Sequence, residues 1–276
     1  METFNYDNNI YITCLEVVMN KILYKITIAM LLCITICTTG IKSYAVSEGH
    51  WYIKHNKGGR PIFPSDANAL SEYNVYYIDK SCEEQGEKKI YLTFDAGYEN
   101  GNVEKILDTL KRESVPAAFF LLDNIIIKNT DLVIRMVDEG HTVCNHTKNH
   151  KNLSHSTKEE IERNLLALEM IYKEKTGKDM AKYFRFPEGN YSIEAIKHVN
   201  DLGYKTIFWS FAYADWDNSR QQSRDKAIKK ILENTHNGAV ILLHPTSSTN
   251  AEILPTLIAE WRGMGYSFGT LDELTK

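Results

Sequence analysis

From Lys88 to the C-terminus, short apolar runs alternate with stretches that carry apolar residues at helical spacing, and this pattern constrains the fold more than any other feature. The apolar runs contain few polar residues, which is typical of strands buried on both faces of a parallel sheet. Repeated strand–helix units of this kind predict an α/β fold in which helices cover a parallel sheet.

The pattern also predicts where the elements lie. The helix over Lys158–Lys175 is the clearest, with Ser156 or Thr157 as its cap and Glu159 or Glu160 completing a capping box. The predicted strands are Ile90–Phe94, Ala117–Leu122, His141–Asn145, Tyr183–Phe186, Thr206–Ser210, Ala239–Leu243 and Ser267–Thr270. The other predicted helices are Val103–Leu110, Ile125–Val137, Ser192–Leu202, Arg224–Asn234 and Ala251–Met264.

Polar residues of types that perform chemistry follow five of the predicted strands. In α/β folds, catalytic groups gather where the strands end, at their carboxyl edge. We therefore expect these residues to lie close together in space. They are Asp95, His146, Arg185, Asp215 and His244.

His146 and His150 lie four positions apart, so on a helical turn their imidazoles face the same way and suit one metal ion. The alternative is a pair of solvated or capping histidines. Asp95 lies two residues before Gly97 and suits a general base or a metal ligand, or else a turn or helix-capping aspartate.

Arg185 suits an ion pair that keeps a carboxylate ionised, or else is a surface arginine before a turn. His244 follows a fully apolar run. A nearby carboxylate such as Asp215 would raise its pKa and make it a proton donor. The alternatives are a satisfied core histidine and a loop aspartate.

The first 45 residues are predicted to lie outside the folded domain. Lys21 and Lys25 precede an apolar segment, Ile26–Cys37, and small residues at Ser43 and Ala45 follow it. This order is typical of a cleaved signal peptide. Its apolar core is shorter than the ~20 residues of a spanning helix, although an uncleaved segment would serve as a membrane anchor.

The signal-like N-terminus predicts a chain of three segments that is exported from the cytoplasm. Residues 1–45 form the signal or membrane segment, and residues 1–18 are upstream of the true start if translation begins at Met19. Residues 46–87 contain several Gly and Pro breakers and form an irregular N-terminal extension, and residues 88–276 form the main domain. The expected location is extracytoplasmic, with membrane contact only through the first segment.

Composition narrows the function further. The formal net charge is −4, and no dense block of Lys and Arg occurs outside the N-terminal flank, so no nucleic-acid partner is expected. Only Cys82 and Cys144 remain after signal cleavage, which is too few for a disulfide framework. Cys144 lies in an apolar run and is expected to be a buried thiol.

Taken together and in this order, the five motifs resemble those of the NodB-homology polysaccharide deacetylases, carbohydrate esterase family 4. The resemblance covers residues 88–274 and implies a distorted, TIM-like (β/α) barrel. Three runs are similar to the PdaA-type branch in particular: Tyr91–Asn102, Phe184–Ser192 and Trp209–Trp216. The lead-in that starts at Trp51 is similar to that branch as well.

The branch resemblance implies a substrate. Its members remove the acetyl group from muramic acid residues of peptidoglycan that have lost their stem peptide, and the product becomes muramic δ-lactam in the spore cortex. The partner is therefore the glycan strand, and the expected location is the cell wall or the space between the forespore membranes.

The resemblance also implies residue roles. His146 and His150 bind a divalent metal, most often Zn²⁺. Asp95 is the general base and Arg185 orients it, while His244 is the general acid and Asp215 supports its charged form. Substrate contacts fall on Trp216, Leu242 and Gly189, and a backbone N–H near Glu188 stabilises the oxyanion.

One position departs from the family pattern. Ala96 stands where the family usually has a third metal ligand. The favoured reading is a weakly held ion with water in the third place. The other readings are that Glu99 or Asp95 serves as the third metal ligand, or that the chain works with little help from a metal.

Two rival functions remain. One is a deacetylase of N-acetylglucosamine in peptidoglycan or of another polysaccharide. The other, supported only by Ala96, is a catalytically inactive glycan-binding module.

Overall fold

The computed structural model describes residues 17–28 and 47–276, and the chain divides into two compact units, residues 1–45 and 46–276. In the first unit, residues 17–28 form an exposed helix. Most of the predicted signal segment and its cleavage site fall outside the described residues. Of the helices in the described ranges, none is both long and apolar enough to cross a membrane.

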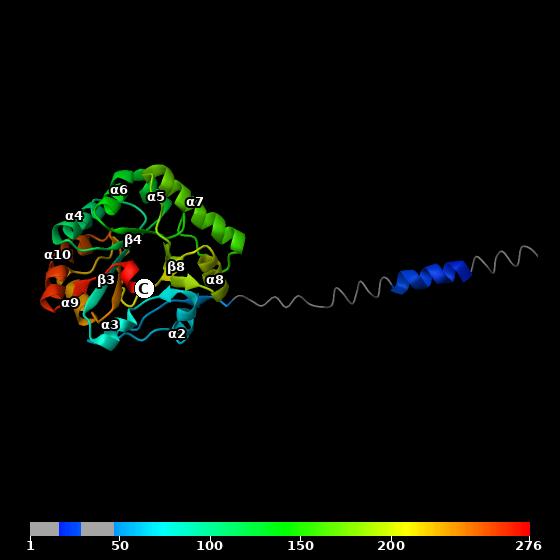
Figure 1. Ribbon diagram of the computed structural model, residues 1–276, viewed down its shortest axis with the longest axis horizontal. Helices are drawn as coiled ribbons and strands as arrows, with labels where there is room; N and C mark the ends of the chain where they lie inside the picture. The colour runs from blue at the N-terminus through cyan, green and yellow to red at the C-terminus, as the bar shows by residue number, and fades with distance from the viewer. Residues whose placement is uncertain (1–16, 29–46) are drawn as a thin grey trace, which may run out of the picture. The chain divides into compact units, whose positions relative to one another are not determined.

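An eight-stranded sheet with parallel pairing forms the centre of the second unit (Figure 1). The strand order is β10-β3-β4-β5-β6-β8-β2, and β9 also pairs with β3. The strands are β2 (Val75–Tyr76), β3 (Lys89–Ala96), β4 (Ala118–Leu121), β5 (Thr142–Asn145), β6 (Tyr183–Phe184), β8 (Lys205–Ile207), β9 (Ala239–Leu243) and β10 (Ser267–Phe268).

The sheet curls toward a closed ring. A parallel bridge between Phe211 and Ile241 links the chain beyond β8 to β9, which itself pairs with β3. The N–H of Leu242 donates to the Phe211 carbonyl at 2.8 Å. The predicted fold class, a distorted (β/α) barrel, is confirmed.

Helices surround this ring in Figure 1. The prediction of one helix over Ile125–Val137 is wrong, because Asn129 leaves the helical region at φ −132° and its carbonyl accepts from the N–H of Leu132 and of Val133 in the next helix. The helices are α4 (Val103–Glu113), α5 (Asp123–Lys128), α6 (Thr130–Asp138), α7 (Lys158–Thr176), α8 (Ile193–Asp201), α9 (Arg224–Glu233), α10 (Ser248–Gly263) and α11 (Leu271–Leu274).

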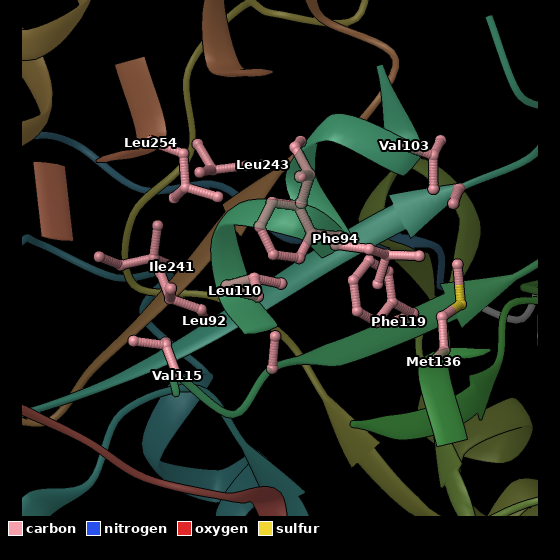
Figure 2. Close-up of a cluster of buried hydrophobic side chains, with 14 of the residues drawn as sticks. Leu92, Phe94, Val103, Leu110, Val115, Phe119, Met136, Ile241, Leu243 and Leu254 are labelled. Carbon is pink, nitrogen blue, oxygen red and sulfur yellow. The ribbon is translucent and has the colours of Figure 1, made fainter. Parts of the chain in front are cut away.

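The core sits between the sheet and these helices. Figure 2 shows Leu92 and Phe94 of β3 packed with side chains from α4, such as Val103 and Leu110, and from α10, such as Leu254. Successive side chains of a strand point to opposite faces. Asp95 therefore points away from this helix-facing core, toward the inside of the ring.

The predicted N-terminal extension is more regular than the sequence suggests. It contains β1 (Gly49–His50), α2 (Ala67–Leu70), η1 (Ser71–Tyr73) and α3 (Lys80–Gln85), and it supplies β2, which pairs with β8 in the main sheet. β1 pairs with β7 (Asn190–Tyr191). The indole of Trp51 stacks on Phe208 at 4.7 Å, and its Nε1 donates to the Trp209 carbonyl at 2.9 Å.

Candidate active site

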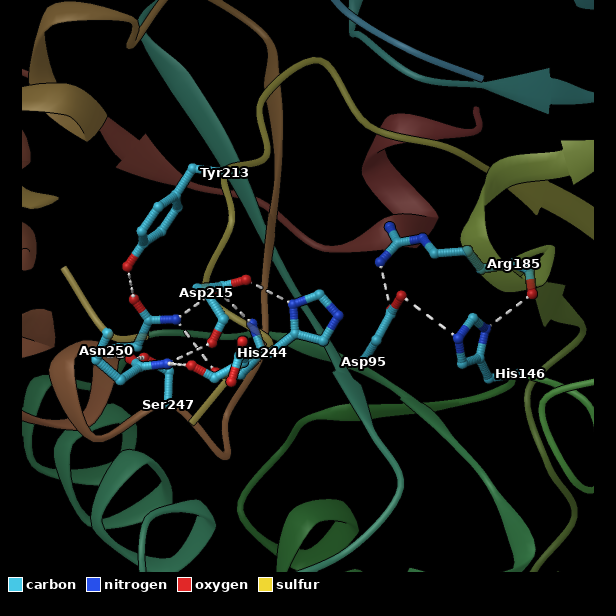
Figure 3. A network of polar contacts seen from close by, with 10 residues as sticks. Asp95, His146, Arg185, Tyr213, Asp215, His244, Ser247 and Asn250 are labelled. Carbon is cyan, nitrogen blue, oxygen red and sulfur yellow. Dashed lines mark hydrogen bonds and ion pairs between the residues drawn. The ribbon is translucent and has the colours of Figure 1, made fainter. Parts of the chain in front are cut away.

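The structure brings the predicted polar residues to the carboxyl ends of the strands. Asp95 is the next-to-last residue of β3, and His146, Arg185 and His244 directly follow β5, β6 and β9. Asp215 lies farther from β8, beyond the Phe211 bridge. Figure 3 shows two groups, one around Asp95 and one around Asp215.

Arg185 holds the first group in place. Its side chain is fully buried, and its Nη1 donates to Asp95 Oδ1 at 2.7 Å. Its Nε donates to the Ile207 carbonyl and its Nη2 to Thr93 Oγ1, both at 2.9 Å. The guanidinium also lies over the ring of Phe120, at 4.1 Å from the centroid. Its several fixed partners leave Asp95 with one defined orientation.

Asp95 is ionised at neutral pH. Burial raises its pKa, but the charge of Arg185, together with the charges of His146 and His244 and the Arg185 hydrogen bond, outweighs burial, and the pKa of Asp95 lies below its ordinary value. A carboxylate that is ionised at neutral pH can accept a proton.

His146 has its tautomer fixed by a backbone carbonyl. Its Nδ1 lies 2.9 Å from the Arg185 carbonyl, which can only accept, so Nδ1 carries the proton. Burial lowers the pKa of His146 to about 4, so the ring is neutral near pH 7. The Nε2 lone pair therefore faces Asp95 Oδ2, 3.5 Å away, and this is the arrangement a metal-binding imidazole needs.

The two histidines do not lie on a helical turn, so that expectation is wrong. Residues 146–150 form a loop in which Thr147 and His150 have positive φ, 69° and 58°. Buried Asn145 holds the loop, because its Oδ1 accepts from the N–H of Thr147 at 2.9 Å. The rings of His146 and His150 still approach, at 5.1 Å between centroids.

The donor set fits a metal site with few protein ligands. The imidazoles of His146 and His150, with 5.1 Å between their ring centroids, are the two side chains offered to one ion. Across residues 17–28 and 47–276, however, no group of three or more His, Cys, Asp or Glu side chains is arranged to hold an ion. The side chains therefore fit an ion whose coordination is completed largely by water.

The environments of Ala96 and Glu99 bear on the missing ligand. Ala96 is fully buried at the end of β3, in the same apolar cluster as Phe94. The carboxylate of Glu99 accepts from the N–H of Gly101 and, at 3.0 Å, from that of Val103, so it caps α4. In this structure the Glu99 carboxylate is thus engaged at the start of α4.

The second group is built on Asp215, whose side chain is fully buried. Its Oδ1 lies 2.7 Å from His244 Nδ1, and its Oδ2 accepts from the N–H of His244 at 2.8 Å. Burial alone would lower the pKa of His244, but the Asp215 carboxylate outweighs burial and raises it. His244 is therefore suited to donate a proton.

Sequence reasoning missed the residues that support these groups. Asn250 in α10 donates to Asp215 Oδ2 at 2.6 Å, and the Tyr213 hydroxyl donates to Asn250 Oδ1 (Figure 3). Thr93 Oγ1 accepts a hydrogen bond from Arg185, as described above. These contacts join segments far apart in the chain, and no spacing in the sequence signals them.

The three predicted substrate-contact residues lie in different surroundings. Trp216 is 61% exposed, and its ring lies 6.1 Å from that of His244. Leu242 is buried in β9. Gly189 has φ 74°, and an added Cβ would lie 2.9 Å from the Trp209 side chain and 3.0 Å from Trp51, so only glycine fits there. Glu188, next to it, also has a positive φ of 57°.

Comparison with known proteins agrees with this site. A family model described as polysaccharide deacetylase matches residues 83–207. The peptidoglycan-N-acetylmuramic acid deacetylase PdaA of Bacillus subtilis is 39% identical over 217 residues, which cover 76% of this chain and 81% of that protein. The solved structure of B. subtilis PdaA, described as a family 4 carbohydrate esterase, matches with a TM-score of 0.78 at 34% identity and covers 83% of this chain and 97% of that one.

A second solved structure matches over a smaller share of the chain. It is described as a family 4 pseudoenzyme from Bacillus anthracis and matches with a TM-score of 0.63 at 28% identity, covering 69% of this chain and 66% of that one. The extent of the match to PdaA in sequence and in structure identifies the present chain as a member of the polysaccharide deacetylases, carbohydrate esterase family 4.

Proposed function

We propose that this chain is a metal-assisted hydrolase that removes the N-acetyl group from muramic acid residues of peptidoglycan whose stem peptide has been removed. The observation that carries the proposal is the pairing of an ionised carboxylate, Asp95, with a histidine of raised pKa, His244, at one end of the barrel. The similarity to PdaA, a muramic acid deacetylase by name, supports the choice of sugar.

Asp95 acts as the general base. It takes a proton from the water that attacks the acetamide carbonyl, and Arg185 keeps its carboxylate ionised and aimed. A backbone N–H near Glu188 is assigned to the oxyanion that forms at the carbonyl oxygen.

His244 acts as the general acid. Its Nδ1 proton is held by Asp215, which leaves Nε2 to donate a proton to the departing amine. The carboxylate also stabilises the imidazolium form, and buried Asn250 keeps that carboxylate in position. Trp216 and Leu242 are assigned to the apolar wall that contacts the sugar and the acetyl methyl group.

His146 and His150 are assigned to a divalent cation, Zn²⁺ by preference, with water in the remaining positions. When bound, the cation would supply Lewis-acid polarisation of the carbonyl and a more acidic attacking water. The neutral state of His146 and the fixed proton on its Nδ1 support this assignment.

The proposed product has a further fate. The freed C2 amine lies close to the lactyl carboxyl of the same sugar, so closure to muramic δ-lactam is intramolecular and loses little entropy. We place the activity in spore cortex formation, outside the cytoplasm, with residues 1–45 as the export signal or anchor.

Two alternatives are separated by one experiment. The sequence alone leaves open a deacetylase of N-acetylglucosamine, and Ala96 leaves open an inactive glycan-binding module. Glycan strands with and without stem peptides are incubated with the Zn²⁺-supplemented protein, and the sugars are analysed by mass spectrometry. Deacetylated muramic acid or its δ-lactam, from peptide-free strands, is the expected result. Free glucosamine units would favour the first alternative, and unchanged strands the second.

A further inference from the structure

Two exposed aromatic side chains lie on loops that follow strands of the sheet, and one of them lies beside the proposed acid. Tyr98, three residues beyond Asp95, is 43% exposed, and Trp216 is 61% exposed. Trp216 approaches His244 edge-on, at 68° between the rings. Large apolar side chains scattered singly on a surface are ordinary, but these two belong to loops that are joined.

A hydrogen bond links the two loops. The side-chain amide of Asn218, two residues beyond Trp216, donates to the Tyr98 hydroxyl at 2.7 Å. The loop between β3 and α4 is therefore tied to the loop that carries Asp215 and Trp216. Tyr98 plays no part in the chemistry proposed above, so this contact needs another explanation.

Further hydrogen bonds hold each of the two loops in place. The side-chain amides of Asn100 and Asn102 donate to the Thr246 carbonyl at 2.9 and 3.0 Å, and Glu99 caps α4. On the other loop, Gln221 Nε2 donates to the carbonyls of Asp215 and Asp217. Loops held in this way lose little conformational entropy when a ligand covers the side chains they carry.

We infer that Tyr98 joins Trp216 in a two-ring platform that stacks a sugar of the glycan strand next to the reacting residue. The apolar face of a pyranose suits an exposed aromatic ring, while the sugar hydroxyls stay in water. This inference rests on the proposed function for the identity of the ligand. It adds Tyr98 as a specificity residue and gives Asn218 the role of positioning it.

The test compares Tyr98→Ala, Tyr98→Phe and the control Met170→Ala, in the full chain with Zn²⁺ and peptide-free glycan strands. Met170 lies on α7 and is 71% exposed. We expect Tyr98→Ala to raise KM about two- to ten-fold, the size expected for one aromatic contact, with a smaller change in kcat. Tyr98→Phe keeps the ring but loses the hydrogen bond from Asn218, so its KM should rise less than that of Tyr98→Ala. Met170→Ala should stay within about two-fold of the wild type.

A binding assay separates failure of this inference from failure of the proposed function. Co-sedimentation with insoluble peptide-free glycan, in the presence of a chelator that stops turnover, measures binding even if no acetate is released. Tyr98→Ala should weaken it by the same factor. Wild-type binding and KM in Tyr98→Ala, or an equal loss in Tyr98→Phe, would overturn the stacking role. If Tyr98→Ala does not fold, Trp216→Ala tests the platform in both assays, and wild-type binding there would also overturn it.

Discussion

Arg185 has no contact with solvent, and its guanidinium donates to backbone carbonyls, to Thr93 and to Asp95 at once. A buried arginine is tolerated only when its charge is compensated and its donors are satisfied. At this scale the site consists of two charge pairs, Arg185–Asp95 and His244–Asp215. They shift the pKa values of Asp95 and His244 in opposite directions. The first lowers the pKa of a base, and the second raises the pKa of an acid.

Asp95→Asn tests the first pair. Leaving the guanidinium buried without its charge partner should lower the free energy of unfolding at pH 7 by about 3–5 kcal/mol. The pKa of Asp95 is depressed in the folded state, so its contribution is present above the unfolded value of about 3.9 and is lost as pH falls through the folded value. Urea unfolding of both proteins should therefore show a gap that narrows below about pH 4.

The control for this series is Asp179→Asn, which removes an exposed ion pair with Lys173. Its effect should be under about 1 kcal/mol at any pH. A gap between Asp95→Asn and the wild type that stays constant from neutral to acid pH would contradict the account of Asp95.

Asp215→Asn tests the second pair. An acid catalyst works while it is protonated, so activity is lost as pH rises through the pKa of His244. Without the carboxylate this pKa falls, and the alkaline limb of the kcat/KM profile should move to lower pH. The rate should also fall by about 10²- to 10⁴-fold.

The measurement is a pH–rate profile with peptide-free glycan strands. Asp217→Asn is the matched control, because it lies two residues away with a partly exposed side chain. An alkaline limb that stays in place in Asp215→Asn would show that another group sets it.

At the scale of elements, local signals decided what the sequence could predict. The strands β3 and β9 follow from unbroken apolar runs, and α7 begins with the predicted capping box of Thr157 and Glu160. The break at Asn129 was missed because no Gly or Pro marks it. The loop of His146 was misread because Thr147 adopts a positive φ, which a β-branched residue rarely does.

The site shows the same division. Residue types at strand ends predicted the members of both charge pairs, because parallel strands bring their carboxyl ends to one edge. The supporting contacts of Asn250 and Thr93 were not predictable, since they join segments far apart in the chain. The sequence also leaves the role of Glu99 open, because its contact with the start of α4 depends on how the intervening loop folds.

Glu99→Ala tests that element-level role. Loss of a helix cap should lower the free energy of unfolding by about 0.5–2 kcal/mol, while Zn²⁺ affinity, measured by chelator competition, should be unchanged. Glu104→Ala, an exposed position in the first turn of α4, is the comparison and should cost less. Zn²⁺ binding that weakens about ten-fold in Glu99→Ala with stability intact would instead make Glu99 a metal ligand.

At the scale of the whole molecule, the part between residues 47 and 87 belongs to the folded unit. Trp51 is 1% exposed and packs against Tyr77 and Phe208, while its neighbour Tyr52 is 54% exposed. The tryptophan therefore joins this segment to the chain that follows β8, and its N–H bonds to the Gly189 carbonyl beside the site.

Trp51→Ala should lower the free energy of unfolding by about 3–5 kcal/mol, because it removes a large buried ring. Tyr52→Ala is a matched control on the same segment and should stay within about 0.5 kcal/mol. Urea unfolding followed by circular dichroism measures both. If Trp51→Ala lowered the free energy of unfolding as little as Tyr52→Ala, residues 47–87 would not be part of the core.

The most direct test of the central claim, metal-assisted deacetylation by this site, is acetate release from peptide-free glycan strands by metal-stripped protein, with and without added Zn²⁺. The account predicts release that Zn²⁺ restores, that His146→Ala abolishes, and that His155→Ala, a change at an exposed histidine nearby, leaves intact. No release with any divalent metal, on peptide-free or peptide-bearing strands, would contradict the account and favour a glycan-binding module.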